Sequence, residues 1–196
     1  MDFSFNALGL SHKFISENVK EGSFCIDGTA GRGRDTLFLS KLVGENGSVL
    51  SFDIQEEAIK STKELLKKEN RNNVTVIHSC HSKIDQYAEK NTADAVMFNF
   101  GWLPGGDHNI FSLGETSVKA IEKGLEILKP GGVMSLCIYC GKETGFDEKK
   151  TLLDFAYSLD QKKYSVLLND FINRRGNPPI AVFILKEKTS LDKNGP

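Results

Sequence analysis

The 196 residues carry 25 basic and 26 acidic side chains, and this net charge of −1 excludes a protein that binds nucleic acid through bulk positive charge and an acidic disordered chain. With 18 glycines beside 39% hydrophobic residues, the composition is that of an ordinary globular protein, and we expect one domain over residues 1–196. No apolar stretch approaches the roughly 20 residues that cross a bilayer and no secretory signal is visible, so we expect a cytoplasmic protein without a membrane partner.

Short apolar runs alternate with stretches of helical spacing along the chain. The apolar runs predict strands at 24–26, 49–52, 74–77, 95–98, 133–140, 166–168 and 181–185. Helical spacing predicts helices at 36–43, 58–66, 118–128 and 152–156. Alternating strands and helices form βαβ units, so we predict an α/β fold with a seven-stranded, mostly parallel sheet and helices on both faces. Ligands in such sheets bind at the carboxyl ends of the strands.

The segment after the first predicted strand combines an acid with a glycine turn. Gly31 and Gly33 allow a tight turn on which a ligand can approach the backbone, and the helix that follows offers free N–H groups. A dinucleotide-binding turn would carry Gly or Ala where this chain has Thr36. Asp27 instead suits the ammonium of an amino-acid moiety, which is the pattern of Rossmann-like class I methyltransferases that use S-adenosylmethionine. A plain structural turn is the alternative.

The ends of the next two strands suit the rest of this cofactor. Asp53 lies 20 residues after Gly33, where a carboxylate can accept from both hydroxyls of a ribose. His81 follows the third strand and is a candidate to line the adenine pocket. The alternative for His81 is a surface histidine at a helix start, with Ser82 as N-cap.

The segment after the fourth strand predicts the methyl-acceptor site. Asn99 and Trp102 are spaced as in the Asn/Asp-Pro-Pro-aromatic box of methyltransferases that act on amino nitrogens, with Phe100-Gly101 in place of Pro-Pro. An Asn oxygen can accept from the amino group and direct its lone pair toward the methyl carbon, while an aromatic ring stacks on the base. Asp107 and His108 are candidates to orient the amine. A loop in which Trp102 only packs is the alternative.

The four cysteines predict no metal site. Cys137 and Cys140 form one CxxC motif without a second pair, inside a run expected to be a strand, where residues three apart face opposite sides. We therefore expect reduced thiols at all four positions, Cys25 and Cys80 included, and thiols buried in the core for Cys137 and Cys140.

Three segments carry motifs that go beyond these spacings. They are Ile26-Asp27 with 35–39, the run Phe52-Asp53-Ile54-Gln55, and the most specific one, Asn99-Phe100-Gly101-Trp102-Leu103-Pro104-Gly105-Gly106-Asp107. With them the whole chain resembles a small bacterial family of putative rRNA methylases, whose members are understood to methylate the aminomethyl group of 5-aminomethyl-2-thiouridine at the tRNA wobble position. The resemblance implies a methyltransferase that uses S-adenosylmethionine and an RNA substrate, with tRNA favoured over rRNA.

The resemblance also implies roles for individual residues. Cofactor binding is expected for Asp27, Thr29, Ala30, Gly31, Arg32, Gly33, Asp35, Thr36, Asp53, Ile54, Gln55, Cys80, His81, Asn99 and Gly101. The catalytic or acceptor side is expected to contain Asn99, Trp102, Asp107, His108, Tyr139 and the stretch 177–179. Relatives usually carry Asn at position 32 and His at position 142, where this chain has Arg32 and Lys142.

A near-neutral chain must contact RNA through a local patch, which we expect around Arg174, Arg175 and Lys142. A solvated basic pair is the alternative for the two arginines. A second subunit could extend this surface, so a homodimer is expected. Other functions left open are an rRNA base-amine methyltransferase, a small-molecule methyltransferase, a nicotinamide-dependent reductase and a non-catalytic RNA chaperone that binds S-adenosylmethionine.

Overall fold

The structure is a computed structural model that describes residues 5–101, 114–139 and 142–188, with side chains left out at 142–146. Its elements in chain order are α1 (Ala7–Asn18), β1 (Phe24–Asp27), α2 (Arg34–Val43), β2 (Ser48–Asp53), α3 (Glu56–Lys68), β3 (Val74–His78), the 3-10 helix η1 (His81–Gln86), β4 (Ala93–Phe100), α4 (Gly114–Ile127), β5 (Leu128–Ile138), α5 (Lys142–Ser158), β6 (Tyr164–Asn169) and β7 (Ile180–Lys186).

The described strands form one seven-stranded sheet in the order β3-β2-β1-β4-β5-β7-β6. The first five strands in this order are parallel, and β7 runs antiparallel to both β5 and β6. The prediction of a mostly parallel sheet is therefore confirmed. From β1 the chain adds β2 and β3 on one side of the sheet and then crosses to β4 on the other side of β1. Open α/β sheets bind ligands at such a switch point, outside the carboxyl ends of the strands.

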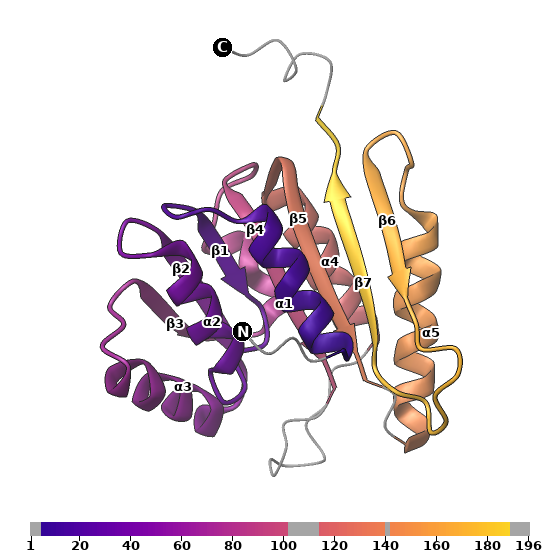
Figure 1. Cartoon of the computed structure of the whole chain (residues 1–196), viewed down its shortest axis with the longest axis horizontal. Coiled ribbons are helices and arrows are strands. Elements are labelled where there is room, and N and C mark those ends of the chain that lie inside the picture. Colours follow the sequence, from indigo (N-terminus) through magenta and orange to yellow (C-terminus); the bar gives the residue numbers. More distant parts are fainter. Residues whose placement is uncertain (1–4, 102–113, 140–141, 189–196) are drawn as a thin grey trace.

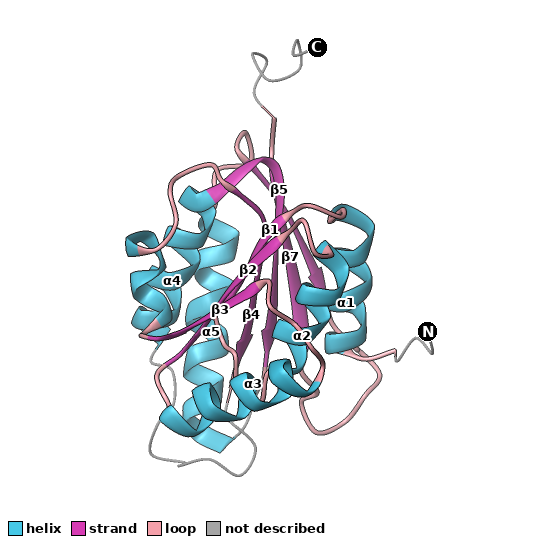
Figure 2. Cartoon of the chain, turned by 90° about the vertical axis from the view of Figure 1, so that its left-hand side faces the viewer, coloured by secondary structure: helices cyan, strands magenta, loops and turns pink. Residues whose placement is uncertain are grey.

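Helices cover both faces of the sheet, as the alternating pattern predicts (Figures 1 and 2). The face with α1 and α2 has a core that includes Ile15, Leu39 and Met97, and the face with α4 and α5 has a core that includes Phe98 and Ile121. Central strands buried on both faces must be apolar at successive positions, which is why they stand out as continuous runs in the sequence.

Helix α1 is an element that the sequence analysis did not predict. Asn6 caps it by accepting a hydrogen bond from the backbone N–H of Gly9 at 2.8 Å. Its buried positions, Ala7, Ser11 and Ile15, face the sheet and include only one large apolar side chain. The helix packs on β5 and β7 (Figure 1). A predicted strand also needs correction, because β5 spans 128–138 rather than 133–140.

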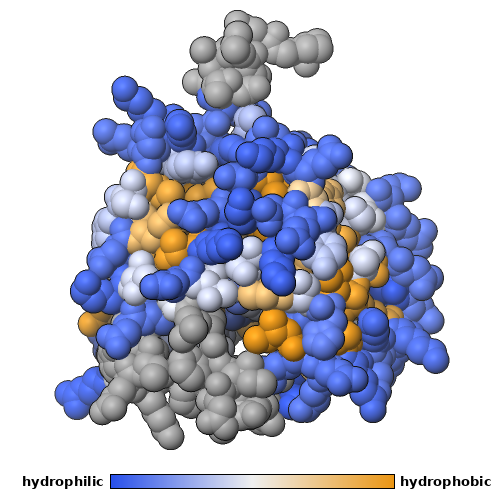
Figure 3. Space-filling model, turned by 180° about the vertical axis from the view of Figure 1, so that it is seen from behind, coloured by the Kyte–Doolittle hydropathy of each residue, from blue (hydrophilic) through white to orange (hydrophobic). Residues whose placement is uncertain are grey.

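Hydrophilic side chains cover most of the rear face of the molecule, with smaller apolar areas between them (Figure 3). This surface fits the near-neutral mixture of charges in the sequence. Within the described ranges, no helix has the length and apolar character needed to span a bilayer.

Candidate functional site

The carboxyl ends of four parallel strands bring the predicted site residues to one edge of the sheet, the lower edge in Figure 1. Asp27 ends β1, Asp53 ends β2, His81 follows β3, and Asn99 lies one residue before the end of β4. Residues from four separate segments thus meet at the switch point of the sheet.

Asp27 supports the glycine turn from beneath. Its side chain has no exposed surface, and its two oxygens accept from the backbone N–H of Thr29 at 3.0 Å and from Oγ1 of Thr36 at 2.6 Å. Burial raises the pKa of Asp27 to about 7, and the charge of Asp35 adds to this rise, while the hydrogen bonds from Thr36 and Thr29 oppose it. This geometry gives Asp27 a role in shaping the turn, and its contact with a ligand ammonium stays a prediction.

The predicted Gly-x-Gly turn is confirmed. Gly31 and Gly33 have φ values of 53° and 78°, in the left-handed region that favours glycine. A Cβ on Gly33 would lie 2.9 Å from the Cα of Thr62, so the turn packs directly on α3. Asp53 holds the turn from β2, because Oδ2 accepts from the N–H of Gly31 and Oδ1 from the N–H of Gln55, each at 2.9 Å. A carboxylate in this position keeps lone pairs for further donors.

His81 presents an unpaired nitrogen to the same edge. Its Nε2 atom is buried and has no hydrogen-bond partner in the part of the chain that the structure describes. Burial lowers the pKa of His81, while the charge of Asp53 and a hydrogen bond to the backbone of Gly28 act in the opposite direction. His81 begins η1, as its alternative assignment expected, but it is partly buried, and Cys80 rather than Ser82 holds the N-cap position.

The remaining predicted cofactor residues lie around these groups. Ala30 donates its N–H to the carbonyl of Phe52 at 2.8 Å, which joins the turn to β2. Ile54 is 48% exposed and offers apolar surface directly after Asp53. Arg32 points to Glu57 on α3, with an N–O distance of 3.4 Å in an exposed ion pair.

Two polar atoms of Asn99 are held by hydrogen bonds to neighbouring residues, and a third polar atom has no partner in the described part of the chain. Its backbone N–H donates to Oγ1 of Thr29 at 2.7 Å, and its side-chain nitrogen donates to Oδ2 of Asp35. Its side-chain oxygen is buried and has no partner among the described residues. Asp35 also contacts His12 of α1, a residue that sequence analysis missed because no spacing rule joins it to the motifs.

Tyr139 lies beside the end of β4 on the expected acceptor side. Its N–H donates to the carbonyl of Phe100 at 2.9 Å, and a Cβ on Gly101 would lie 2.9 Å from its Cβ. Burial raises the pKa of Tyr139 to about 12, and Cys137 and Asp35 act in the same direction. Four other predicted residues lie outside the described ranges: Trp102, Asp107, His108 and Cys140.

The exposed Arg174 is engaged by the protein itself. Its Nη2 donates to the carbonyl of Phe5 at 2.8 Å, and its guanidinium carbon lies 3.9 Å from the ring centroid of Phe171. Arg175 is also exposed. Phosphate contacts by Arg174 and Arg175 stay a prediction.

Cys25 and Cys137 are buried free thiols, as predicted for Cys137. Burial raises the pKa of both Cys25 and Cys137 to about 12, and Cys137 Sγ lies 3.0 Å from Oγ of Ser11. Cys80 is partly buried, with its Sγ 3.1 Å from Oγ of Ser82. Across the described residues, no group of three His, Cys, Asp or Glu side chains is placed to hold a metal ion.

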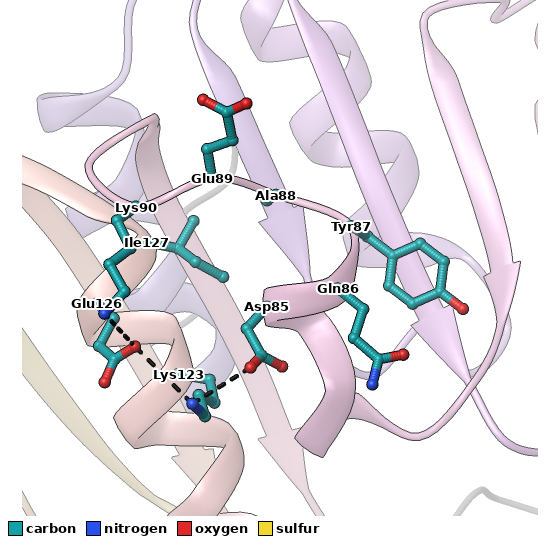
Figure 4. Close-up of a pocket in the computed structure, with 9 residues that line it drawn as sticks. All are labelled: Asp85, Gln86, Tyr87, Ala88, Glu89, Lys90, Lys123, Glu126 and Ile127. Carbon is teal, nitrogen blue, oxygen red and sulfur yellow. Dashed lines mark ion pairs between the residues drawn. The ribbon is translucent and has the colours of Figure 1, made fainter.

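A pocket of about 580 Å³ lies elsewhere, between the segment 85–90 and the C-terminal part of α4 (Figure 4). Lys123 lies between Asp85 and Glu126, at N–O distances of 3.2 and 3.9 Å, and Lys90 contacts Glu126 at 3.3 Å. None of the predicted site residues lines this pocket, so the carboxyl edge of the sheet is the candidate site.

Comparisons with known proteins agree with this geometry. A family described as "Putative rRNA methylase" matches residues 49–185. A protein from Arabidopsis thaliana, "tRNA (mnm(5)s(2)U34)-methyltransferase, chloroplastic", is 33% identical over 192 residues, which cover 93% of this chain and 70% of that protein.

Two solved structures share both fold and sequence with this chain. A putative rRNA methylase from Clostridium thermocellum is 46% identical with a TM-score of 0.91, over 93% of this chain and 98% of that one. A putative methyltransferase from Streptococcus mutans, solved in complex with SAH, is 36% identical with a TM-score of 0.85, over 93% of this chain and 99% of that one. The chain therefore belongs to the putative rRNA methylase family, a family of enzymes with the Rossmann-like methyltransferase fold.

Proposed function

We propose that the protein is an RNA methyltransferase that uses S-adenosylmethionine to N-methylate the aminomethyl group of 5-aminomethyl-2-thiouridine at the tRNA wobble position. The observation that carries the proposal is the side-chain oxygen of Asn99, a buried acceptor without a partner among the described residues, at the carboxyl end of β4. The name of the Arabidopsis relative supports the choice of tRNA and of this nucleoside.

The described residues fit S-adenosylmethionine, since a ligand with an amino-acid end, a ribose and a base would meet a suitable group at each part. The amino-acid end would lie on the turn at 29–33, above Asp27. The ribose hydroxyls would donate to Asp53, whose oxygens point to this edge. The adenine would lie between the exposed side chain of Ile54 and the free Nε2 of His81, next to Cys80.

The chain's own residues position the acceptor amine. When bound, the cofactor supplies a sulfonium methyl group, and the amine lone pair forms the new N–C bond while the C–S electron pair returns to sulfur. Asn99 Oδ1 accepts one N–H of the amine and thereby turns the lone pair toward the methyl carbon. No strong base is needed when the amine arrives neutral. A tyrosine phenol is protonated at neutral pH, and burial raises the pKa of Tyr139 further, to about 12, so its O–H is available to donate to the nucleoside.

An RNA substrate fits the near-neutral charge of the chain if recognition depends on one nucleoside placed in the site rather than on the overall field. The exposed Arg174 and Arg175 are the proposed phosphate contacts, and the cytoplasm is the expected compartment for a tRNA-modifying enzyme. The homodimer stays a prediction that sedimentation velocity of the full chain would test.

The direct test separates tRNA nucleosides by mass from a strain that lacks this protein. We expect 5-aminomethyl-2-thiouridine to accumulate and the gene to restore the methylated form. The variant Asn99→Ala should fail to restore it, whereas Asn18→Ala, which changes an exposed asparagine of α1, should succeed. Unchanged tRNA nucleosides would reject the proposal, and a methyl group missing from rRNA instead would favour the base-amine alternative.

A further inference from the structure

His12 connects helix α1 to the candidate site. Its Nε2 lies 2.6 Å from Oδ1 of Asp35, and its ring stacks on Phe38 with the centroids 4.0 Å apart and the planes 6° from parallel. The His12 side chain is 30% exposed and that of Asp35 only 9%. The stacked ring and the hydrogen bond together fix the imidazole against α2.

The second oxygen of Asp35 accepts from the side-chain nitrogen of Asn99. An ionised carboxylate only accepts hydrogen bonds, so Asn99 must turn its NH₂ group toward Asp35 and its oxygen away. The oxygen that faces away is the buried acceptor without a partner in the described chain. The chemistry of Asp35 therefore fixes which way the Asn99 amide faces, with Nδ2 toward Asp35 and Oδ1 away from it.

His12 holds the other oxygen of the Asp35 side chain. Its Nε2 lies 2.6 Å from Oδ1, and an N–H on this nitrogen directed at Oδ1 leaves Oδ2 as the acceptor for Asn99. Without this hydrogen bond the carboxylate can rotate, and the position of Oδ2 against the Asn99 amide is no longer fixed.

The geometry points to His12 and Asp35 as positioning residues that orient the Asn99 amide so that its oxygen meets the acceptor amine. This inference rests on the proposed function for the identity of the amine, although the orientation of the amide can be measured without it. A merely structural role, in which His12 ties α1 to α2, predicts lower stability without a specific loss of methyl transfer.

Two substitutions at His12 separate the hydrogen bond from the stacking. His12→Phe keeps a ring against Phe38 and removes the donor, whereas His12→Gln gives up the ring and places an N–H donor near the position of Nε2. With tRNA that carries the aminomethyl group, we expect kcat of His12→Phe to fall by about tenfold to a hundredfold. The KM for tRNA and the Kd for S-adenosylhomocysteine should stay close to those of the unaltered protein, and His12→Gln should regain most of the rate.

Asp35→Asn tests the orientation directly. With His12 donating to the oxygen of Asn at position 35, the new NH₂ faces Asn99 and reverses its amide. We expect this variant to lose methyl transfer at least as strongly as His12→Phe. Equal kcat values for His12→Phe and His12→Gln, or an unaltered kcat in His12→Phe, would overturn the inference.

A spectroscopic measurement decides the inference even if the tRNA assay fails. The side-chain amide signals of Asn99 in a proton–nitrogen correlation spectrum can be assigned by their absence in Asn99→Ala. They should shift in His12→Phe and stay in place in His12→Gln. Signals that do not respond to His12→Phe would reject the positioning role, whereas an unaltered protein that methylates no tRNA rejects only the proposed function. Melting temperatures of all variants show which of them are folded.

Discussion

Thr36 donates a hydrogen bond from Oγ1 to Oδ2 of Asp27 across 2.6 Å, and the carboxylate that accepts it has no exposed surface. The same hydroxyl lies 2.7 Å from Oγ of Ser51 on β2. Thr36 stands where a dinucleotide-binding turn would carry Gly or Ala. Its hydroxyl therefore has a function that neither of those residues could perform, because it supplies a partner to a buried acid.

Replacing Thr36 with Val keeps the shape of the side chain and removes this donor. The oxygen of Asp27 would lose its partner in a site without water access, so we expect the free energy of unfolding to fall by about 1–3 kcal/mol. Urea unfolding monitored by circular dichroism measures this change. Thr151→Val, at an exposed threonine of α5, is the control and should change stability by less than about 0.5 kcal/mol. Similar losses in the two variants would contradict the assigned role.

The buried acid at position 27 predicts a pH dependence of stability. Burial, with the charge of Asp35, raises the pKa of Asp27 to about 7 in the folded chain, compared with about 3.9 in an unfolded chain. Between these values the folded state binds more protons than the unfolded state, so the free energy of unfolding falls as the pH rises. The stabilising contribution is complete at low pH and is lost as the pH rises through the folded pKa.

Asp27→Asn isolates this effect from other titrating groups. The difference in free energy of unfolding between the unaltered protein and the variant should decrease as the pH rises from about 4 to about 7, by no more than about 1.4 kcal/mol per pH unit. Urea titrations at several pH values measure it. A difference that is flat, or that grows with pH, would show that Asp27 is ionised across this range.

The fold could be predicted because the central strands β1, β4 and β5 are mostly buried and therefore apolar at successive positions, and because β1 and β2 end on acids. Helix α1 could not, because the residues it buries are mostly small or polar. Ser11 has no exposed surface and lies between Ala7 and Ile15 on the face that packs on the sheet. A serine at that position breaks the apolar spacing by which a helix is recognised.

The site could be predicted in part for a related reason. Asp53 and Asn99 lie at the carboxyl ends of β2 and β4, and the carboxyl ends of parallel strands meet at one edge of the sheet. Their proximity could therefore be predicted from the strands alone. The contact between His12 and Asp35 joins residues 23 positions apart on two helices, and only tertiary packing brings them together. The support of the turn by Asp27 likewise depends on burial that the sequence does not display.

Asp53 offers a test of the cofactor site. Its two oxygens accept from the backbone N–H groups of Gly31 and Gln55. Asp53→Asn would place an NH₂ group against one of these donors and would remove an acceptor for the ribose hydroxyls. We expect the Kd for S-adenosylhomocysteine, measured by calorimetry, to rise at least tenfold, or about 1.4 kcal/mol. Asp85→Asn, in the pocket between η1 and α4, is the matched control and should bind like the unaltered protein. Equal affinities in both variants would place the cofactor elsewhere.

Alanine substitutions at Gly33 and Gly22 distinguish the cost of backbone strain from the cost of a steric clash. Both have positive φ, 78° and 85°, but a Cβ on Gly33 would lie 2.9 Å from the Cα of Thr62, whereas a Cβ on Gly22 meets no atom within 4 Å. Gly22→Ala should cost about 1–2 kcal/mol of stability through the backbone alone. Gly33→Ala should cost about 1–3 kcal/mol more, because α2 and α3 must move apart. Calorimetric unfolding measures both, and equal costs would show that the turn can yield without disturbing α3.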